Sequence, residues 1–202
     1  MSVPTSIAGC ILAGGQSRRM GEDKARLLLG ETPLITHAIA RLAPQVAQLI
    51  VNRHDGTQPI DTQGLPVVTD APGDHLGPLA GLLAALDWAG RHDFAFVATA
   101  AVDTPFFPRD LVPKLVAAAQ GLDMAVASSD GRLHPVFGLW KVTLVPVLLD
   151  FMQGSRRSMN DWAMSQGAGI AEWTSLPYDP FFNINTPEDM DMALRLRAEY
   201  RP

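Results

Sequence analysis

A glycine pair followed by basic side chains is the part of this sequence best suited to chemistry. Gly14 and Gly15 directly follow a short apolar run, and Arg18, Arg19 and Lys24 come soon after. Glycines allow backbone approaches that a Cβ would forbid, and inward-turned N–H groups can cradle anionic oxygens. The cations add the positive charge that a triphosphate needs. The pattern favours an anion-binding loop over a flexible surface turn, although it matches neither the P-loop nor the dinucleotide fingerprint.

A carboxylate, Asp103, is the candidate metal ligand. It follows the apolar run that ends at Thr99, and the Thr104-Pro105 turn behind it would hold it in place. Mg²⁺ prefers one or two carboxylates together with phosphate oxygens and water. Asp103 at the end of a strand would therefore suit a magnesium–nucleotide complex. The alternative is that Asp103 caps a helix starting near Arg109.

Three further candidates follow predicted strands or open a helix. Asn52 carries an amide, which offers a donor and an acceptor to a base edge, but asparagine is also common in turns. Asp70 ends the next strand, where a loop cap is the alternative. Gly77 and Gly81 frame a Gly-Pro-Leu-Ala-Gly turn and would let the backbone pack closely against a ligand.

The second half of the chain holds a smaller group of polar candidates. Asn183 and Asn185 alternate along an extended segment and so share one face, and Thr186 can cap the helix that follows. Arg156 belongs to a basic pair that would suit a phosphate or would simply be a solvated helix start. His134, before an apolar run, is either a ligand contact or a structural histidine.

Strands and helices alternate along the chain and must position these residues. Apolar runs predict strands at 7–12, 48–51, 65–68, 94–99, 124–127 and 136–140. Helical spacing predicts helices at 34–42, 77–88, 111–119, 142–152, 158–164 and 187–200. This order predicts a three-layer, Rossmann-like α/β fold, with a mostly parallel sheet and helices on both faces. We expect one domain over 1–202, and the carboxyl ends of its strands should carry the site.

Composition excludes several classes of protein. The 202 residues are 47% hydrophobic and 18% charged, as in a compact globular protein. The net charge of −5 lacks the basic footprint of a nucleic-acid-binding protein. No apolar stretch approaches the ~20 residues of a membrane span. The single cysteine, Cys10, lies in an apolar run and is expected to be an inert core thiol, which fits a cytoplasmic protein.

The run from Leu12 to Lys24, L-A-G-G-Q-S-R-R-M-G-E-D-K, resembles the signature of nucleotidyltransferases with a GT-A-type fold. Later segments, among them H-P-V-F-G and N-I-N-T-P-E-D, narrow the resemblance to the molybdenum cofactor guanylyltransferases, the MobA family. It spans most of the chain. One departure is local: Ala101-Val102 precede Asp103, where the family usually has Pro-Cys or similar residues.

The resemblance implies a role for each candidate. It assigns GTP binding to the nucleotide half, about residues 1–110, through Leu12, Ala13, Gly14, Gly15, Lys24, Asn52, Asp70, Gly77 and Asp103. It assigns catalysis to Arg18, Arg19, Lys24 and Asp103, with Mg²⁺ on Asp103. It assigns the acceptor to the half from about 111 to 202, through His134, Arg156, Asn183 and Asn185.

The implied reaction is transfer of GMP from GTP to Mo-molybdopterin, with release of pyrophosphate. A molybdoenzyme or its chaperone would be a protein partner. Two alternatives stay open at this point. One keeps the chemistry and changes the substrates, as in a molybdopterin cytidylyltransferase or a sugar- or terpenoid-phosphate relative. The other is a carrier that binds the cofactor without chemistry.

Overall fold

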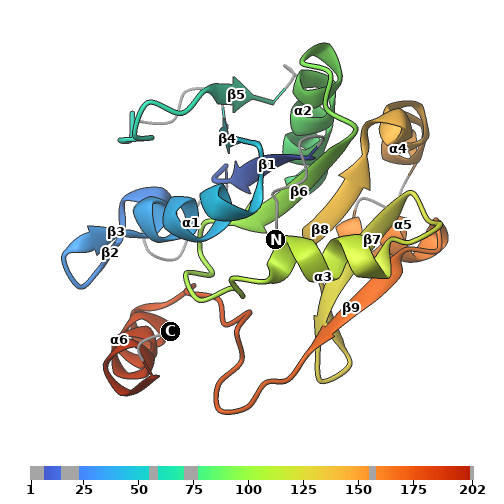
Figure 1. Ribbon diagram of the computed structural model, residues 1–202. Coiled ribbons are helices and arrows are strands. Elements are labelled where there is room, and N and C mark those ends of the chain that lie inside the picture. Colours follow the sequence, from blue (N-terminus) through green and yellow to red (C-terminus); the bar gives the residue numbers. More distant parts are fainter. Residues whose placement is uncertain (1–6, 15–22, 55–58, 71–76, 155–157, 201–202) are drawn as a thin grey trace.

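Parallel pairing of buried strands forms the centre of the molecule. The computed structural model describes residues 7–14, 23–54, 59–70, 77–154 and 158–200. Its main sheet has the strand order β5–β4–β1–β6–β8–β7–β9 (Figure 1). These strands are β1 (Ile7–Leu12), β4 (Gln48–Arg53), β5 (Val67–Thr69), β6 (Phe96–Ala101), β7 (Met124–Ser129), β8 (Arg132–Lys141) and β9 (Gly169–Trp173). Every residue of β1 is buried, as expected for a parallel strand covered on both faces.

One strand of the main sheet, β8, runs against its neighbours. It pairs antiparallel with both β6 and β7, whereas the other pairs in the sheet are parallel. The amino end of β8 therefore lies at the same edge of the sheet as the carboxyl ends of β1, β4, β5 and β6. A tight turn at Asp130 and Gly131, both with positive φ, joins β7 to β8.

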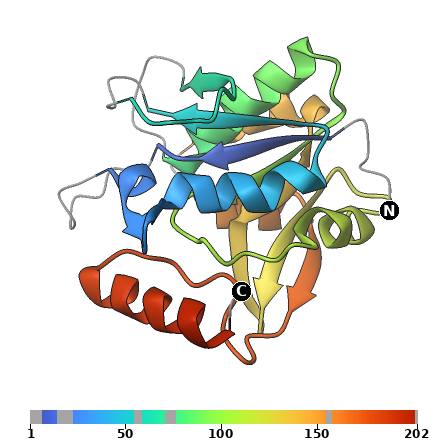
Figure 2. The same cartoon turned by 60° about the vertical axis from the view of Figure 1, so that its left-hand side comes forward.

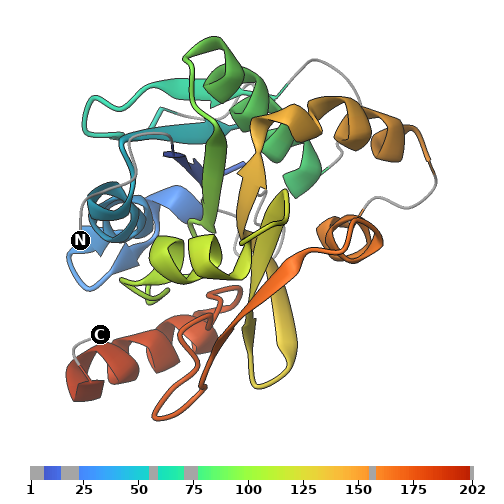
Figure 3. The ribbon, with the colours of Figure 1, turned by 45° about the vertical axis from the view of Figure 1, so that its right-hand side comes forward.

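Helices cover both faces of the sheet. One apolar layer includes residues of α1 (Leu34–Leu42), α3 (Leu111–Ala118) and α6 (Pro187–Tyr200), and Figure 2 shows α1 in front of the strands with α6 beside it. The other layer contains α2 (Pro78–Arg91), α4 (Val145–Gln153) and α5 (Met159–Ser165), which Figure 3 brings forward. Each layer draws residues from both halves of the chain. The predicted three-layer α/β fold is confirmed.

The predicted helices and strands are present with small changes in their ends. The helix predicted over 142–152 begins with a 3-10 turn, η3 (Val142–Leu144), and its α-helical part starts at Val145. Two features were not predicted: strand β9, and the small hairpin of β2 (Leu28–Leu29) and β3 (Thr32–Pro33). β9 is short and alternates exposed and buried residues at the edge of the sheet, so it lacks the apolar run that revealed the others. No helix in the described ranges is long and apolar enough to cross a membrane.

Candidate active site

The described loops at one edge of the sheet enclose a cleft of about 470 Å³. Strands β1, β4, β5 and β6 end there because they are parallel, and the reversed β8 begins there. The cleft is lined by Leu12, Gly14, Lys24, Asn52, His54, Asp70, Gly77, Pro78, Ala101, Val102, Asp103, Arg132, Leu133, His134, Pro135, Val136, Phe137 and Asn183. One cavity thus contacts residues from both halves of the chain.

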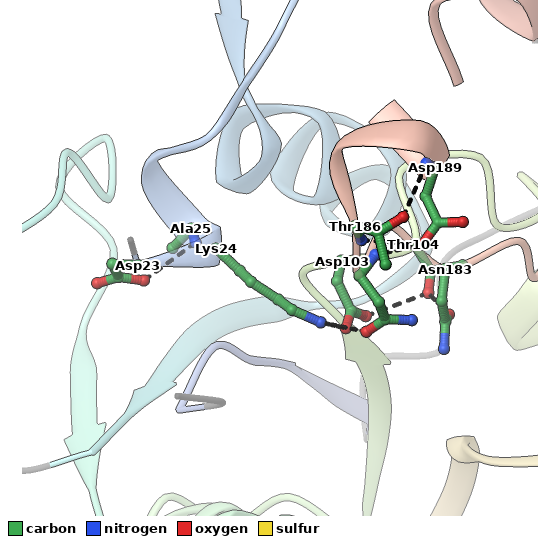
Figure 4. Close-up of polar contacts among 9 residues, drawn as sticks. Asp23, Lys24, Ala25, Asp103, Thr104, Asn183, Thr186 and Asp189 are labelled. Atoms are coloured by element: carbon green, nitrogen blue, oxygen red, sulfur yellow. Dashed lines mark hydrogen bonds and ion pairs between the residues drawn. The ribbon is translucent and has the colours of Figure 1, made fainter. Parts of the chain in front are cut away.

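Lys24 and Asp103 form the charged centre of this cleft (Figure 4). The Nζ atom of Lys24 lies 2.8 Å from Oδ2 of Asp103 and also donates to Oδ1 of Asn185. Both charged side chains are largely buried, at 13% and 19% exposure. Because Lys24 and Asp103 both keep some access to the cleft, each can leave the other and bind a ligand instead.

The segment around Asn183 is held against Asp103 by short contacts. The backbone N–H of Ile184 donates to the carbonyl oxygen of Asp103 at 2.8 Å, and the hydroxyl of Thr104 donates to Oδ1 of Asn183. Asn183 and Asn185 thereby come beside Asp103 although they are distant in sequence. Asp103 does not cap α3, since that helix begins at Leu111 after Asp110. The alternative interpretation of Asp103 as a helix cap is therefore wrong.

The cap of α6 also fixes the position of Asn185. Thr186 Oγ1 accepts from the backbone N–H of Asp189 at 3.2 Å, so the predicted cap is confirmed. In return, Oδ2 of Asp189 accepts from the N–H groups of Asn185 and Thr186, both at 2.9 Å. This reciprocal capping box stabilises the start of the helix and the loop before it.

A buried ion pair supports the turn that carries Lys24. Arg53, at the end of β4, is 4% exposed and donates to both carboxylate oxygens of Asp23, at 3.2 and 2.6 Å. Oδ1 of Asp23 also accepts from Ala25 N–H at 3.0 Å and so starts the short helix η1 (Lys24–Arg26). Through Asp23, Arg53 therefore holds the turn from which the Lys24 side chain extends.

Asn52 and Asp70 form the opposite wall of the cleft. Asn52 is 2% exposed, and its Nδ2 donates to Oδ1 of Asp70 at 2.8 Å. The ring of His54 lies 2.9 Å from the other carboxylate oxygen of Asp70. A Cβ added at Gly81 would lie 2.4 Å from Oδ1 of Asn52, so this glycine makes room for Asn52. Gly77 has a φ of +59°, which favours glycine.

His134 stands on the wall contributed by β8. Its ring stacks on Phe181 with a centroid distance of 4.6 Å. Burial lowers the pKa of His134 below its ordinary value, and the nearby Arg132 lowers it further, while Asp179 and Glu172 oppose the shift. His134 therefore favours the neutral imidazole at pH 7. Cys10, by contrast, lies outside the cleft, and burial raises the pKa of its thiol, as expected for an inert core residue.

The remaining predicted site residues fall into two groups. Ala13 is buried behind the cleft, where its N–H donates to Asn52 O at 2.9 Å. Gly15, Arg18, Arg19 and Arg156 lie outside the described residues, so their predicted roles stay predictions.

The chain is similar to proteins of known family. A family model described as the MobA-like NTP transferase domain matches residues 9–167. The molybdenum cofactor guanylyltransferase of Bradyrhizobium sp. (strain ORS 278) is 41% identical, over 98% of this chain and 96% of its own. The corresponding protein of Rhodobacter capsulatus is 44% identical, over 93% and 94%. The chain belongs to the molybdenum cofactor guanylyltransferase family.

Two solved structures share the fold of this guanylyltransferase family member. The molybdopterin-guanine dinucleotide biosynthesis protein A of Archaeoglobus fulgidus superimposes with a TM-score of 0.70 at 21% identity, covering 95% of this chain and 99% of that one. The 4-diphosphocytidyl-2C-methyl-D-erythritol synthase of Anaerococcus prevotii gives 0.73 at 12% identity, covering 96% of each chain. These two likenesses concern the fold alone.

The oxygen donors of this candidate site suit a hard divalent cation. No group of three or more His, Cys, Asp or Glu side chains in the described ranges could hold a metal ion. Asp103 supplies a carboxylate, and the Oδ1 atoms of Asn183 and Asn185 lie in the same hydrogen-bonded cluster. Magnesium takes few protein ligands and completes its shell with phosphates and water. The donor set therefore fits an ion that arrives with a nucleotide.

Several residues that shape the site were missed by the sequence analysis. Arg53 and Asp23 are distant in sequence, and no local pattern pairs them. Ser129 and Asp179, which contact each other behind His134, are likewise distant. A signal was available for the β7–β8 hairpin: Asp-Gly between two apolar runs favours a two-residue turn. Reading it would have placed the start of β8, and with it His134, at the edge of the sheet.

Proposed function

We propose that this protein transfers GMP from GTP to Mo-molybdopterin and releases pyrophosphate, forming the guanine dinucleotide form of the cofactor. The observation that carries the proposal is the cluster of Lys24, Asp103 and Asn185, at the edge where β1, β4, β5, β6 and β8 meet. Membership of the guanylyltransferase family supplies the reaction class.

The chemistry needs alignment more than a strong base. An oxygen of the acceptor phosphate attacks the α-phosphorus of GTP, forming a new P–O bond, while the bond from the α-phosphorus to the bridging oxygen breaks. The electron pair leaves with pyrophosphate. Because the attacking phosphate is already ionised, holding the two substrates in line and neutralising their charge are the main tasks of the protein.

Each described residue has a task in this proposal. Lys24 binds the phosphates of GTP as a mobile cation, and Asp70 with Asn52 contacts the nucleoside. Gly14 and Gly77 let the backbone come close to the ligand. Leu12 and Ala13, at the end of β1, support the nucleotide side of the cleft. Arg18, Arg19 and Gly15 lie outside the described residues, and the proposal assigns them to phosphate binding in the same nucleotide half, about 1–110.

The acceptor half, from about 111 to 202, holds Mo-molybdopterin in this proposal. His134, Asn183, Asn185 and Arg156 contact the acceptor. Asp103, with the amide oxygens of Asn183 and Asn185, would hold Mg²⁺. When bound, this ion would neutralise negative charge on the phosphates, as in other phosphoryl transfers.

The proposal also extends to partners and location. A molybdoenzyme or its chaperone would receive the product. A cytoplasmic location is consistent with a chain whose one thiol is buried and free.

Pyrophosphate release is the direct test. Purified protein is incubated with Mg²⁺, Mo-molybdopterin and either GTP or CTP, and pyrophosphate is measured together with the nucleotide content of the product. Release with GTP and not with CTP is the expected result. Preference for CTP would reassign the protein as a cytidylyltransferase. Tight pterin binding without release from either nucleotide would instead indicate a carrier.

A further inference from the structure

Three side chains form a hydrogen-bonded network behind the wall of the cleft that β8 contributes. Nε2 of His134 lies 2.7 Å from Oγ of Ser129, and that hydroxyl donates to Oδ1 of Asp179 at 3.1 Å. The same carboxylate oxygen accepts from the backbone N–H of Phe181 at 2.9 Å. Ser129 is 3% exposed, so water has little access to the middle of the network.

The direction of these hydrogen bonds fixes the proton on His134. An ionised carboxylate only accepts hydrogen bonds, so Ser129 must donate its one proton to Asp179. The oxygen of Ser129 can then only accept from His134, which requires a proton on Nε2. A neutral imidazole carries one proton, so Nδ1 bears a lone pair. The low pKa that burial gives His134 maintains this neutral form.

The surroundings of His134 indicate what that lone pair meets. His134 lines the cleft, and with Nε2 already engaged, Nδ1 is the one ring atom left to accept from a ligand. Stacking on Phe181 holds the plane of the ring. Pro135, Val136 and Phe137 line the cleft beside it. A lone pair repels an ionised phosphate but accepts from an N–H group, and an apolar wall suits a flat heterocycle.

We propose that Ser129 and Asp179 are positioning residues that hold His134 in its Nε2–H tautomer, so that Nδ1 accepts a hydrogen bond from an N–H group of the acceptor's heterocycle. This inference rests on the proposed function, because it assumes a pterin acceptor. It divides the acceptor's binding between two places. The ring lies against His134, and the phosphate lies toward Lys24 and Asp103.

The tautomer can be measured without any activity. In protein labelled with ¹⁵N-histidine, two-dimensional ¹H–¹⁵N spectra distinguish a protonated ring nitrogen from one with a lone pair, and a His134→Gln spectrum identifies the signals. We expect Nε2 protonated and Nδ1 bare at pH 7.5 in the wild type. Ser129→Ala should change this pattern. A proton on Nδ1 in the wild type would overturn the proposal.

Kinetics then test what the tautomer does. Ser129→Ala and Asp179→Ala should raise KM for Mo-molybdopterin about 10-fold, the effect of losing one well-aligned hydrogen bond. KM for GTP should stay unchanged. Asp179→Asn should restore most of the affinity, since its amide oxygen still accepts from Ser129 and from Phe181 N–H. Ser128→Ala, a buried serine pointing to the other face of β7, is the matched control and should behave as wild type.

Two failures would look different. If the wild type released no pyrophosphate with GTP and Mo-molybdopterin, the proposed function would fail, and the role of His134 with it. If the wild type were active but Ser129→Ala left KM for the acceptor unchanged, the role assigned to Ser129 and Asp179 alone would be wrong. An equal rise in KM for both substrates would also contradict it, since that pattern indicates general damage to the fold.

Discussion

At the scale of single residues, the site depends on a carboxylate that can change partners. Asp103 is bound to Lys24, yet it keeps some access to the cleft. In the proposed function, the acceptor and GTP bring several negative charges to this point. We therefore expect Lys24 to turn toward phosphate and Asp103 toward a cation when the substrates bind, because each would then face opposite charge.

Replacing Asp103 with Asn keeps its shape and removes its charge. We expect folding to be retained and turnover to fall at least about 100-fold, in the range of a lost transition-state electrostatic contact. Pyrophosphate release at saturating Mg²⁺ measures this. Asp123→Asn is the control, because the same change there breaks only an exposed pair with Lys141. Normal turnover in Asp103→Asn would remove Asp103 from the metal site.

Lys24→Ala should weaken GTP binding more than acceptor binding. Loss of the cation removes a phosphate contact, which corresponds to roughly 10-fold in KM for GTP. Lys24→Met, which keeps most of the apolar stem, separates the effect of charge from that of packing. Titration with GTP by calorimetry measures affinity directly. Unchanged GTP affinity in both variants would contradict the assignment.

At the scale of elements, α2 packs so closely on β4 that a single methyl group matters. Gly81 faces the amide of Asn52, and a Cβ there would lie 2.4 Å from Oδ1. From the sequence, this glycine was expected to pack against the ligand. In the structure, Gly81 contacts Asn52 instead, and the space it leaves lets the Asn52 amide donate to Asp70.

Gly81→Ala and Gly90→Ala form a matched pair within α2. A Cβ at Gly90 meets nothing within 4 Å, so alanine there should raise the free energy of unfolding by up to about 1 kcal/mol through helix propensity. At Gly81 the same gain in helix propensity is opposed by the clash of the new Cβ with the Asn52 amide. We therefore expect Gly81→Ala to lower the free energy of unfolding and to weaken GTP binding, measured by urea unfolding and calorimetry. Equal behaviour of the two variants would contradict this account.

Prediction from sequence was good for elements and partial for the site. Apolar runs and helical spacing are local signals, so they predicted the core strands and most helix ends. Residues at or just after the ends of parallel strands, such as Asn52 and Asp103, were also predicted, because such ends meet at one edge. The pairing of Arg53 with Asp23, or of Thr104 with Asn183, depends on distant segments coming together. No local pattern encodes those contacts.

At the scale of the whole molecule, two half-buried histidines link stability to pH. Burial lowers the pKa of His37, and the charges of Arg197 and Arg41 add to this, although a hydrogen bond with the Leu29 backbone opposes it. Burial likewise lowers the pKa of His134. Their pKa values in the folded state thus lie below about 6.5, the value for an unfolded chain. Between the two values the unfolded chain binds more protons.

The free energy of unfolding should therefore decrease as the pH falls from 7 toward 5. The stability that depends on neutral His37 and His134 is fully present above their pKa in the unfolded chain. It is lost as the pH falls through their lower pKa values in the folded protein. Urea unfolding at several pH values measures the slope. His37→Gln removes one titrating group, so its slope should be shallower than that of the wild type. An identical slope in both proteins would show that His37 does not contribute.

The reversed strand β8 also bears on how such a site can diversify. The wall that carries His134 begins at a two-residue turn, whereas the opposite wall includes Asn52, His54 and Asp70 at the ends of β4 and β5. A hairpin can be lengthened at its tip, two residues at a time, and each added pair, one residue in each strand, extends it by about 3.4 Å. Insertions at Asp130-Gly131 would leave the register of the parallel strands unchanged. In the proposed function, larger or smaller acceptors can therefore be accommodated through the hairpin, while the residues assigned to the nucleotide stay fixed.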